Sequence, residues 1–101
     1  MARLVKVAAT GDLEKGQGKV VDAEGVPVAL FHIDGQFHAV ANECPHRGGP
    51  LGEGSLAGTQ VICPWHGWQF DVVSGACTTN PEARQTTYPV HLKGDEILIE
   101  I

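Results

Sequence analysis

Turn-forming residues interrupt this chain so often that no apolar run continues far. Thirteen glycines and six prolines are spread through 101 residues. Neither residue suits the interior of a helix, and both favour tight turns between short strands. Helix signals are nearly absent, with at most one turn expected over residues 12–15, before Gly16. A chain of this length forms one domain, so the sequence predicts a single all-β domain over residues 1–101, built as a sandwich or small barrel.

Short runs rich in apolar and β-branched residues locate the expected strands. The clearest hairpin joins two such runs through Asp34-Gly35, a strong two-residue turn signal. Further hairpins are expected to turn at residues 74–75 and 93–95. Two stretches, 42–58 and 63–68, fit no strand and are expected to be loops. The expected strands lie around residues 4–7, 20–21, 28–33, 36–40, 69–72 and 96–101.

Acidic residues outnumber basic ones by twelve to seven, which gives a net charge of −5. This balance argues against a nucleic acid or an anionic membrane surface as partner and favours a basic protein. No run approaches the roughly 18 apolar residues of a membrane span, and the N-terminus lacks the apolar core of a signal peptide. We therefore expect a monomeric cytoplasmic protein with no membrane or nucleic-acid partner.

Both expected loops carry one cysteine and one histidine. The first contains Cys44-Pro45-His46, the second contains Cys63-Pro64-Trp65-His66, and sixteen residues separate His46 from Cys63. Thiolate and imidazole bind zinc, copper or iron–sulfur clusters, not calcium or magnesium. Three cysteines make a disulfide framework improbable, so these four residues are the candidate metal ligands. The remaining candidates are interpreted as structural residues: Cys77, His32, His38 and His91.

A zinc site with two cysteines and two histidines is the main alternative at this stage. Zinc modules commonly pair Cys with Cys and His with His, whereas each loop here mixes the two types. Glycines 48, 49 and 67 let the backbone approach a buried sulfur core closely. This composition favours an iron–sulfur cluster over zinc.

The motif and its flanks resemble the Rieske [2Fe–2S] family, most closely the soluble Rieske ferredoxins that serve bacterial oxygenases. The matching flanks are Arg47 to Leu51, Gly67 to Asp71 and Ser74-Gly75. The resemblance implies small antiparallel sheets with a two-loop cluster-binding subdomain. It also implies one [2Fe–2S] cluster, with Cys44 and Cys63 on the inner iron and His46 and His66 on the outer iron. A third, proline-containing loop that covers the cluster is matched to residues 79–81.

Departures from the respiratory branch of the family indicate a low reduction potential. Gly49 and Trp65 stand where that branch has two further cysteines joined as a disulfide, and Trp68 and Phe70 stand where it has two hydroxyl side chains. With fewer hydrogen bonds to the cluster, the added electron is less stabilised.

The resemblance implies an electron carrier and not an enzyme. The carrier would pass single electrons from a flavin-dependent reductase to a terminal oxygenase, docking both partners at the tip that bears His46 and His66. A catalytic oxygenase would need a further domain with a mononuclear iron, for which 101 residues leave no room. The small subunit of an assimilatory nitrite reductase and a zinc-binding interaction module remain as alternatives.

Overall fold

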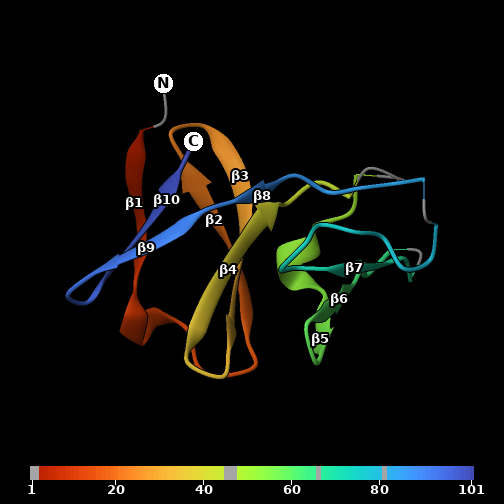
Figure 1. The fold of residues 1–101 in the computed structure, drawn as a ribbon, viewed down its shortest axis with the longest axis horizontal. Coiled ribbons are helices and arrows are strands. Elements are labelled where there is room, and N and C mark those ends of the chain that lie inside the picture. The colour runs from red at the N-terminus through yellow and green to blue at the C-terminus, as the bar shows by residue number, and fades with distance from the viewer. Residues whose placement is uncertain (1–2, 45–47, 66, 81) are drawn as a thin grey trace.

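The computed structural model describes residues 3–44, 48–65, 67–80 and 82–101. Within these residues, ten strands and two short 3-10 turns follow one another, which confirms the all-β fold (Figure 1). None of the described helical segments is long and apolar enough to cross a membrane. The elements are β1 (Leu4–Ala9), η1 (Thr10–Asp12), β2 (Gly18–Ala23), β3 (Val26–Ile33), β4 (Gln36–Ala41), η2 (Leu51–Glu53), β5 (Ser55–Ala57), β6 (Gln60–Ile62), β7 (Gln69–Asp71), β8 (Thr87–Tyr88), β9 (Val90–Lys93) and β10 (Glu96–Glu100).

The described strands form three small antiparallel sheets. Their orders are β1-β10-β9, β2-β3-β4-β8 and β5-β6-β7. The two ends of the chain meet, because the Arg3 and Ile101 main chains exchange hydrogen bonds of 3.0 and 2.9 Å. Figure 1 shows the β5-β6-β7 sheet at one end of the molecule and the β1-β10-β9 sheet toward the other, with β3 and β4 between them.

Strand β3 is buried on both faces and separates two apolar cores. Val28 and Leu30 belong to a core shared with Ile97 and Ile99 of β10. The alternate residues of β3, Ala29 and Phe31, belong to a second core on the side of the β5-β6-β7 sheet. Because successive side chains of a strand point to opposite faces, one strand serves both cores. The first core holds the framework together, and the second contains the candidate site.

The two best-marked hairpins of the sequence are confirmed. Asp34 and Gly35 have φ angles of +48° and +84°, and they join β3 to β4 with Ile33 paired to Gln36. Positive φ at both central residues is the geometry that Asp-Gly supports best in a two-residue hairpin. The hairpin over residues 93–95 likewise joins β9 to β10.

Two local expectations are wrong. Strand β5 lies inside the stretch 42–58, which was expected to contain no strand. Its three residues are too few for a period-two pattern, and the strand exists because it pairs with β6. The expected hairpin at 74–75, by contrast, is confirmed at its turn. The chain reverses after β7, Phe70 forms an antiparallel bridge with Cys77, and the Asp71 and Thr78 N–H groups donate to the Ala76 and Gln69 carbonyls at 2.8 and 2.9 Å, although the returning residues form bridges and not a full strand.

The expected helical turn is displaced: a 3-10 turn spans Thr10–Asp12 and not residues 12–15, and a second one, η2, spans Leu51–Glu53. The Asp12 carboxylate accepts a hydrogen bond of 2.9 Å from the N–H of Ala9, the residue that precedes the turn, and so caps the beginning of the turn. Leu13 then continues in an extended conformation and is buried in the first core. An extended Leu13 cannot belong to a helical turn over residues 12–15.

Candidate metal centre

Cys44 and Cys63 lie in one apolar core. Their exposed fractions are 1% and 2%, and both pack in the cluster that contains Phe31 and Phe70. No disulfide joins the three cysteines of the chain, and all three are buried. An apolar core disfavours an isolated thiolate, which needs a cation close to it. Two buried thiols in such a core therefore fit a metal centre.

The main chain of the first loop folds back around Cys44. The Cys44 N–H donates to the Gly49 carbonyl at 2.9 Å, and the Gly48 N–H donates to the Cys44 carbonyl at 2.7 Å. Gly48 has a φ of +75°, in the left-handed region that side chains rarely adopt. The cysteine carbonyl and N–H are both satisfied within the loop, which fixes the direction of the Cys44 backbone.

The second loop repeats this arrangement at the same offsets. The Cys63 N–H donates to the Trp68 carbonyl at 2.7 Å, and the Gly67 N–H donates to the Cys63 carbonyl at 3.0 Å. Gly67 also has a φ of +75°. In both loops the glycine stands four residues after the cysteine and the accepting carbonyl five residues after it. Two separate segments thus present a cysteine in the same local geometry.

The two loops touch at Gly49. A Cβ atom placed on Gly49 would lie 2.7 Å from Sγ of Cys63 and 3.1 Å from Cγ of Trp65. Contacts under 3.0 Å do not occur between real atoms of these kinds, so any side chain here would displace the Cys63 thiol. The close backbone approach predicted from the glycines is therefore confirmed at Gly49. The lack of a side chain at this residue leaves room for the Cys63 thiol.

Of the four predicted ligands, the structure brings Cys44 and Cys63 into one core. His46 and His66 lie outside the described residues, as do Pro45, Arg47 and Pro81. Each histidine follows its cysteine within a few residues, inside a loop whose described ends are fixed as above. The donor set of two thiols and two imidazoles is the set that a Rieske-type cluster requires.

The third loop attaches beside the second cysteine loop. Thr79 Oγ1 accepts a hydrogen bond of 3.0 Å from the Gln69 N–H, at the start of β7. The Asn80 N–H donates to Cys77 Sγ at 3.3 Å, and Cys77 is buried in the same core as the two loop cysteines. Cys77 thus packs in the core and holds the third loop, in keeping with the structural role given to it from the sequence.

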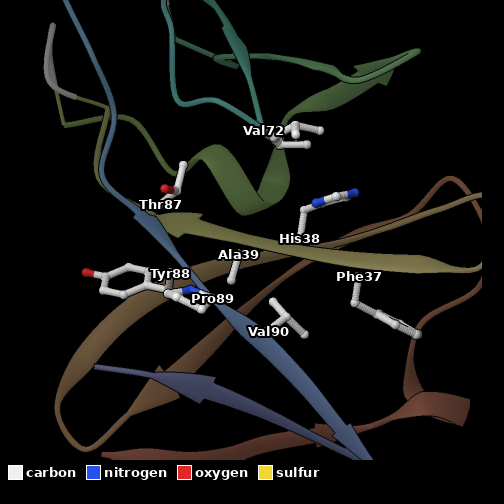
Figure 2. A pocket seen from close by; sticks show the side chains of 9 residues that line it. Phe37, His38, Ala39, Val72, Thr87, Tyr88, Pro89 and Val90 are labelled. Carbon is white, nitrogen blue, oxygen red and sulfur yellow. The ribbon is translucent and has the colours of Figure 1, made fainter. Parts of the chain in front are cut away.

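The other histidines take part in structural contacts. His32 Nδ1 lies 3.0 Å from the Leu13 carbonyl, and His91 Nε2 lies 3.1 Å from the Glu100 carboxylate. His38 lines a cleft of about 440 Å³ between β4, the turn after β7 and the segment around β8. Figure 2 shows His38 projecting from β4 on the side where Val72 lies. No cysteine lines this cleft.

Asp71 closes the turn that follows β7. Its carboxylate accepts hydrogen bonds from the Val73 N–H at 2.8 Å, the Ser74 N–H at 3.1 Å and the Thr59 hydroxyl at 3.1 Å. Partial burial raises the pKa of Asp71, but the two N–H donors, the hydroxyl and the nearby His38 together outweigh it, so the pKa lies below its usual value. This carboxylate therefore remains charged at neutral pH and stabilises the turn.

Two aromatic residues take the positions where hydroxyl side chains are found in the respiratory branch. Phe70 is fully buried in the core of the two cysteines, and Trp68 packs against that core with its ring centre 6.5 Å from that of Phe70. Neither side chain has a hydroxyl to offer a cluster sulfide. The two side chains on which the expected low potential depends therefore belong to, or pack against, the core that holds the cysteines.

Comparison with known proteins agrees with this geometry. The family model described as "Rieske [2Fe-2S] domain" matches residues 3–91. The ferredoxin component of the naphthalene 1,2-dioxygenase system of Pseudomonas aeruginosa is 30% identical over 96% of this chain and 94% of its own length. This likeness extends well beyond the two cysteine loops.

Two solved structures share the whole fold. A complex of reduced oxygenase and oxidised ferredoxin in carbazole 1,9a-dioxygenase contains a chain with a TM-score of 0.87 and 30% identity, over 95% of this chain and 91% of that one. A putative NADH-dependent nitrite reductase small subunit from Mycobacterium tuberculosis gives a TM-score of 0.92 with 26% identity, over 100% of this chain and 96% of that one. Because the family model spans both cysteine loops, this chain belongs to the Rieske [2Fe–2S] domain family, and its cofactor is a Rieske-type [2Fe–2S] cluster.

Proposed function

We propose that this chain, as a single Rieske domain over residues 1–101, carries single electrons from a flavin-dependent reductase to a terminal oxygenase. In this proposal Cys44 and Cys63 bind the inner iron, and His46 and His66 bind the outer iron. The observation that carries it is the pair of buried cysteine loops with the same backbone geometry, which face one core and touch at Gly49.

The cluster supplies reversible one-electron chemistry when it is bound. The chain contributes a dry environment, since both cysteines are almost fully buried among aliphatic and aromatic side chains. It also fixes the cysteine backbones by paired hydrogen bonds, which limits how far the ligands move when the charge changes. A rigid, apolar ligand environment suits rapid electron exchange between partners.

The oxygenase partner is supported by the whole-length likeness to ferredoxin components of dioxygenase systems. We place the docking surface at the tip that carries His46 and His66, with Arg47 and Trp68 at its rim. Trp65, beside His66 in the sequence, is 58% exposed and adds an aromatic side chain to this part of the surface. The contact with each partner is expected to be small and transient, as in other redox encounters.

A cytoplasmic, monomeric protein fits two further observations. The three cysteines form no disulfide, which suits a reducing compartment. The large apolar side chains that are exposed among the described residues are scattered over different elements and form no single long face. They are Leu4, Val20, Val26, Trp65, Val73 and Leu92.

Reconstitution tests the proposal directly. The holoprotein is mixed with an NADH-dependent flavin reductase and a Rieske-type terminal oxygenase from one genomic neighbourhood, and product formation is followed with and without the carrier. Turnover that depends on the carrier supports the proposal. Charge changes at the tip, such as Arg47→Glu, should alter turnover and its salt dependence more than Lys93→Glu or Asp95→Lys at the distant hairpin. Equal effects at both places would contradict docking at the tip.

The nitrite reductase small subunit is the second candidate, favoured by the fold match over the whole of this chain. A subunit should form a stable complex with its large subunit, whereas a carrier should not remain bound during gel filtration. Retention of both cysteines and both histidines favours the carrier. Visible absorption and iron analysis distinguish either from the zinc module, which would be colourless.

A further inference from the structure

Among the described residues, Gln85 is the one buried polar side chain. It is 8% exposed and lies in the irregular segment between Cys77 and β8, with exposed residues on either side. Burial of an amide is unfavourable unless its donors and acceptor are used. The partners of this amide therefore show what the burial achieves.

Both donors of the Gln85 amide go to the beginning of the first cysteine loop. Nε2 donates to the Ala41 carbonyl at 2.7 Å and to the Glu43 carbonyl at 2.7 Å. Ala41 is the last residue of β4, and Glu43 directly precedes Cys44. An amide nitrogen carries two hydrogens, so one side chain can satisfy both carbonyls at once. Gln85 thus holds the two residues that flank Asn42 at a fixed distance from its own main chain.

The main chain at Gln85 is itself fixed to the part of the molecule that carries Cys63. Its N–H donates to the Gly75 carbonyl at 2.7 Å, and Gly75 belongs to the turn that follows β7. The neighbouring Thr86 carbonyl accepts from the Ala41 N–H at 2.9 Å. A short path of hydrogen bonds therefore runs from the start of the Cys44 loop through Gln85 to the turn after β7, the strand that follows the Cys63 loop.

From this geometry we infer that Gln85 is a positioning residue for the cluster: it sets where Cys44 stands relative to Cys63. The inference rests on the proposed function, because it requires Cys44 to be a cluster ligand. Gln85 acts through the main chain of residues 41–43 and touches no reacting atom. Without its amide, two carbonyls beside Cys44 lose their donors, and the loop can shift to recover water or other partners.

Three substitutions separate the hydrogen bonds from the packing. Gln85→Met keeps the length of the side chain and removes both donors. Gln85→Glu keeps the shape and sets a carboxylate against two carbonyl oxygens. Gln85→Asn keeps an amide that is one methylene shorter and can reach fewer of its partners. The matched control is Gln17→Met, because the Gln17 side chain makes one hydrogen bond, with the Glu14 N–H at 3.1 Å, in an exposed turn away from the cysteines.

Each variant is purified as the anaerobic holoprotein, and three quantities are measured: the rate of cluster release to a chelator, the line shape of the EPR spectrum of the reduced form, and the reduction potential. For Gln85→Met and Gln85→Glu we expect release roughly tenfold faster than wild type, broader EPR features because Cys44 occupies more than one position, and a displaced potential. Gln85→Asn should fall between these variants and wild type, and Gln17→Met should match wild type. If Gln85→Met assembles no cluster, Gln85→Asn supplies the same comparison at a milder level.

A purely structural role would lower thermal stability while leaving the EPR line shape and the potential as in wild type, and that result overturns the inference. Failure of the ligand assignment is recognised separately. If Cys44→Ala retains the wild-type visible spectrum, the proposed ligand set is wrong. If Cys44→Ala loses the spectrum but Gln85→Met behaves like Gln17→Met, only the role of Gln85 is rejected.

Discussion

The two cysteine loops are alike inside and different at their ends. Inside each loop, the cysteine N–H and carbonyl are satisfied at the same offsets and a glycine has a φ of +75°. At their ends, the Cys63 loop connects β6 to β7, and these strands pair directly, with Ile62 opposite Gln69. The second loop is therefore closed by its own hairpin, through contacts between residues near in sequence.

The Cys44 loop is closed at the same offsets, but by one isolated antiparallel bridge, Glu43 with Pro50, and not by a pair of strands. Asn42 adds two local contacts: its carbonyl accepts from the Leu51 N–H at 2.8 Å, and its side chain accepts from the Gly52 N–H at 2.8 Å. The position of this loop in the molecule also depends on Gln85, more than forty residues away. The difference teaches that one local motif can be built twice, with paired strands closing one copy, and with a single bridge and an added long-range contact holding the other.

The largest expected effect is loss of the cluster, and it should follow from removing the cysteine of either loop. Cys44→Ala and Cys63→Ala should each abolish cluster assembly, because each removes a thiolate that balances the charge of the inner iron. Visible absorption and iron content per chain measure the loss. Cys77→Ser is the control and should keep the wild-type spectrum, because Cys77 only accepts the Asn80 N–H in the core. Loss of iron in the Cys77 variant would show that the ligand assignment is wrong.

A substitution at Gly49, where the two loops touch, should reduce cluster content nearly as much. Gly49→Ala places a Cβ 2.7 Å from Cys63 Sγ, so either the loops separate or the thiol moves. We expect a clearly reduced cluster content and faster bleaching in air, measured by absorption. Gly11→Ala is the control, since its Cβ would meet no atom within 4 Å and its φ is not positive. Equal cluster content in the two variants would contradict the close approach.

Because the two loops have the same backbone geometry, replacing the corresponding glycine in each should lower the free energy of unfolding by the same amount. Gly48→Ala and Gly67→Ala each force a side chain into the left-handed region, at a cost of about 1–2 kcal/mol in the free energy of unfolding. Anaerobic denaturation of the two holoproteins should give values that agree within about 0.5 kcal/mol, the usual spread for matched surface changes. A large difference would mean that the loops are not equivalent in solution.

The aromatic residues next to the second loop should set the potential. We expect wild type near the bottom of the Rieske range, about −150 mV, constant around neutral pH and falling at higher pH as the ligand histidines lose protons in the oxidised state. Phe70→Tyr, at a fully buried position among the cysteines, should raise the potential by adding a hydroxyl donor. Protein-film voltammetry across pH measures the reduction potential of wild type and of the Phe70→Tyr variant. A wild-type value above about +200 mV would remove the low-potential assignment.

The smallest expected effect lies in the turn after β7. The pKa of Asp71 is lowered in the folded chain, so its contribution to stability is present above the unfolded pKa and is lost as pH falls through the folded pKa. Asp71→Asn should therefore be slightly less stable than wild type at pH 7, and the two should converge in acid. Unfolding curves at several pH values provide the test, and a difference that grows in acid would contradict it.

The sequence by itself determined the features that depend on neighbouring residues. Asp34-Gly35 specified a hairpin, the apolar runs of β3 and β10 specified buried strands, and the glycine spacing specified the interior of both cysteine loops. These features follow from backbone sterics and from the two-residue period of a strand, which act within a few residues. The two cysteine–histidine pairs likewise indicate the cluster from the sequence alone.

Only the tertiary structure decided what joins distant segments. Strand β5 exists because β6 pairs with it, and three residues alone carry no readable period. Gln85 has no sequence signal, because a glutamine among exposed polar residues gives no reason to expect burial. Its role appears when the fold brings the carbonyls of Ala41 and Glu43 within 2.7 Å of its amide. Hydrogen bonds between remote segments form only after the chain has folded, so their partners cannot be read from local pattern.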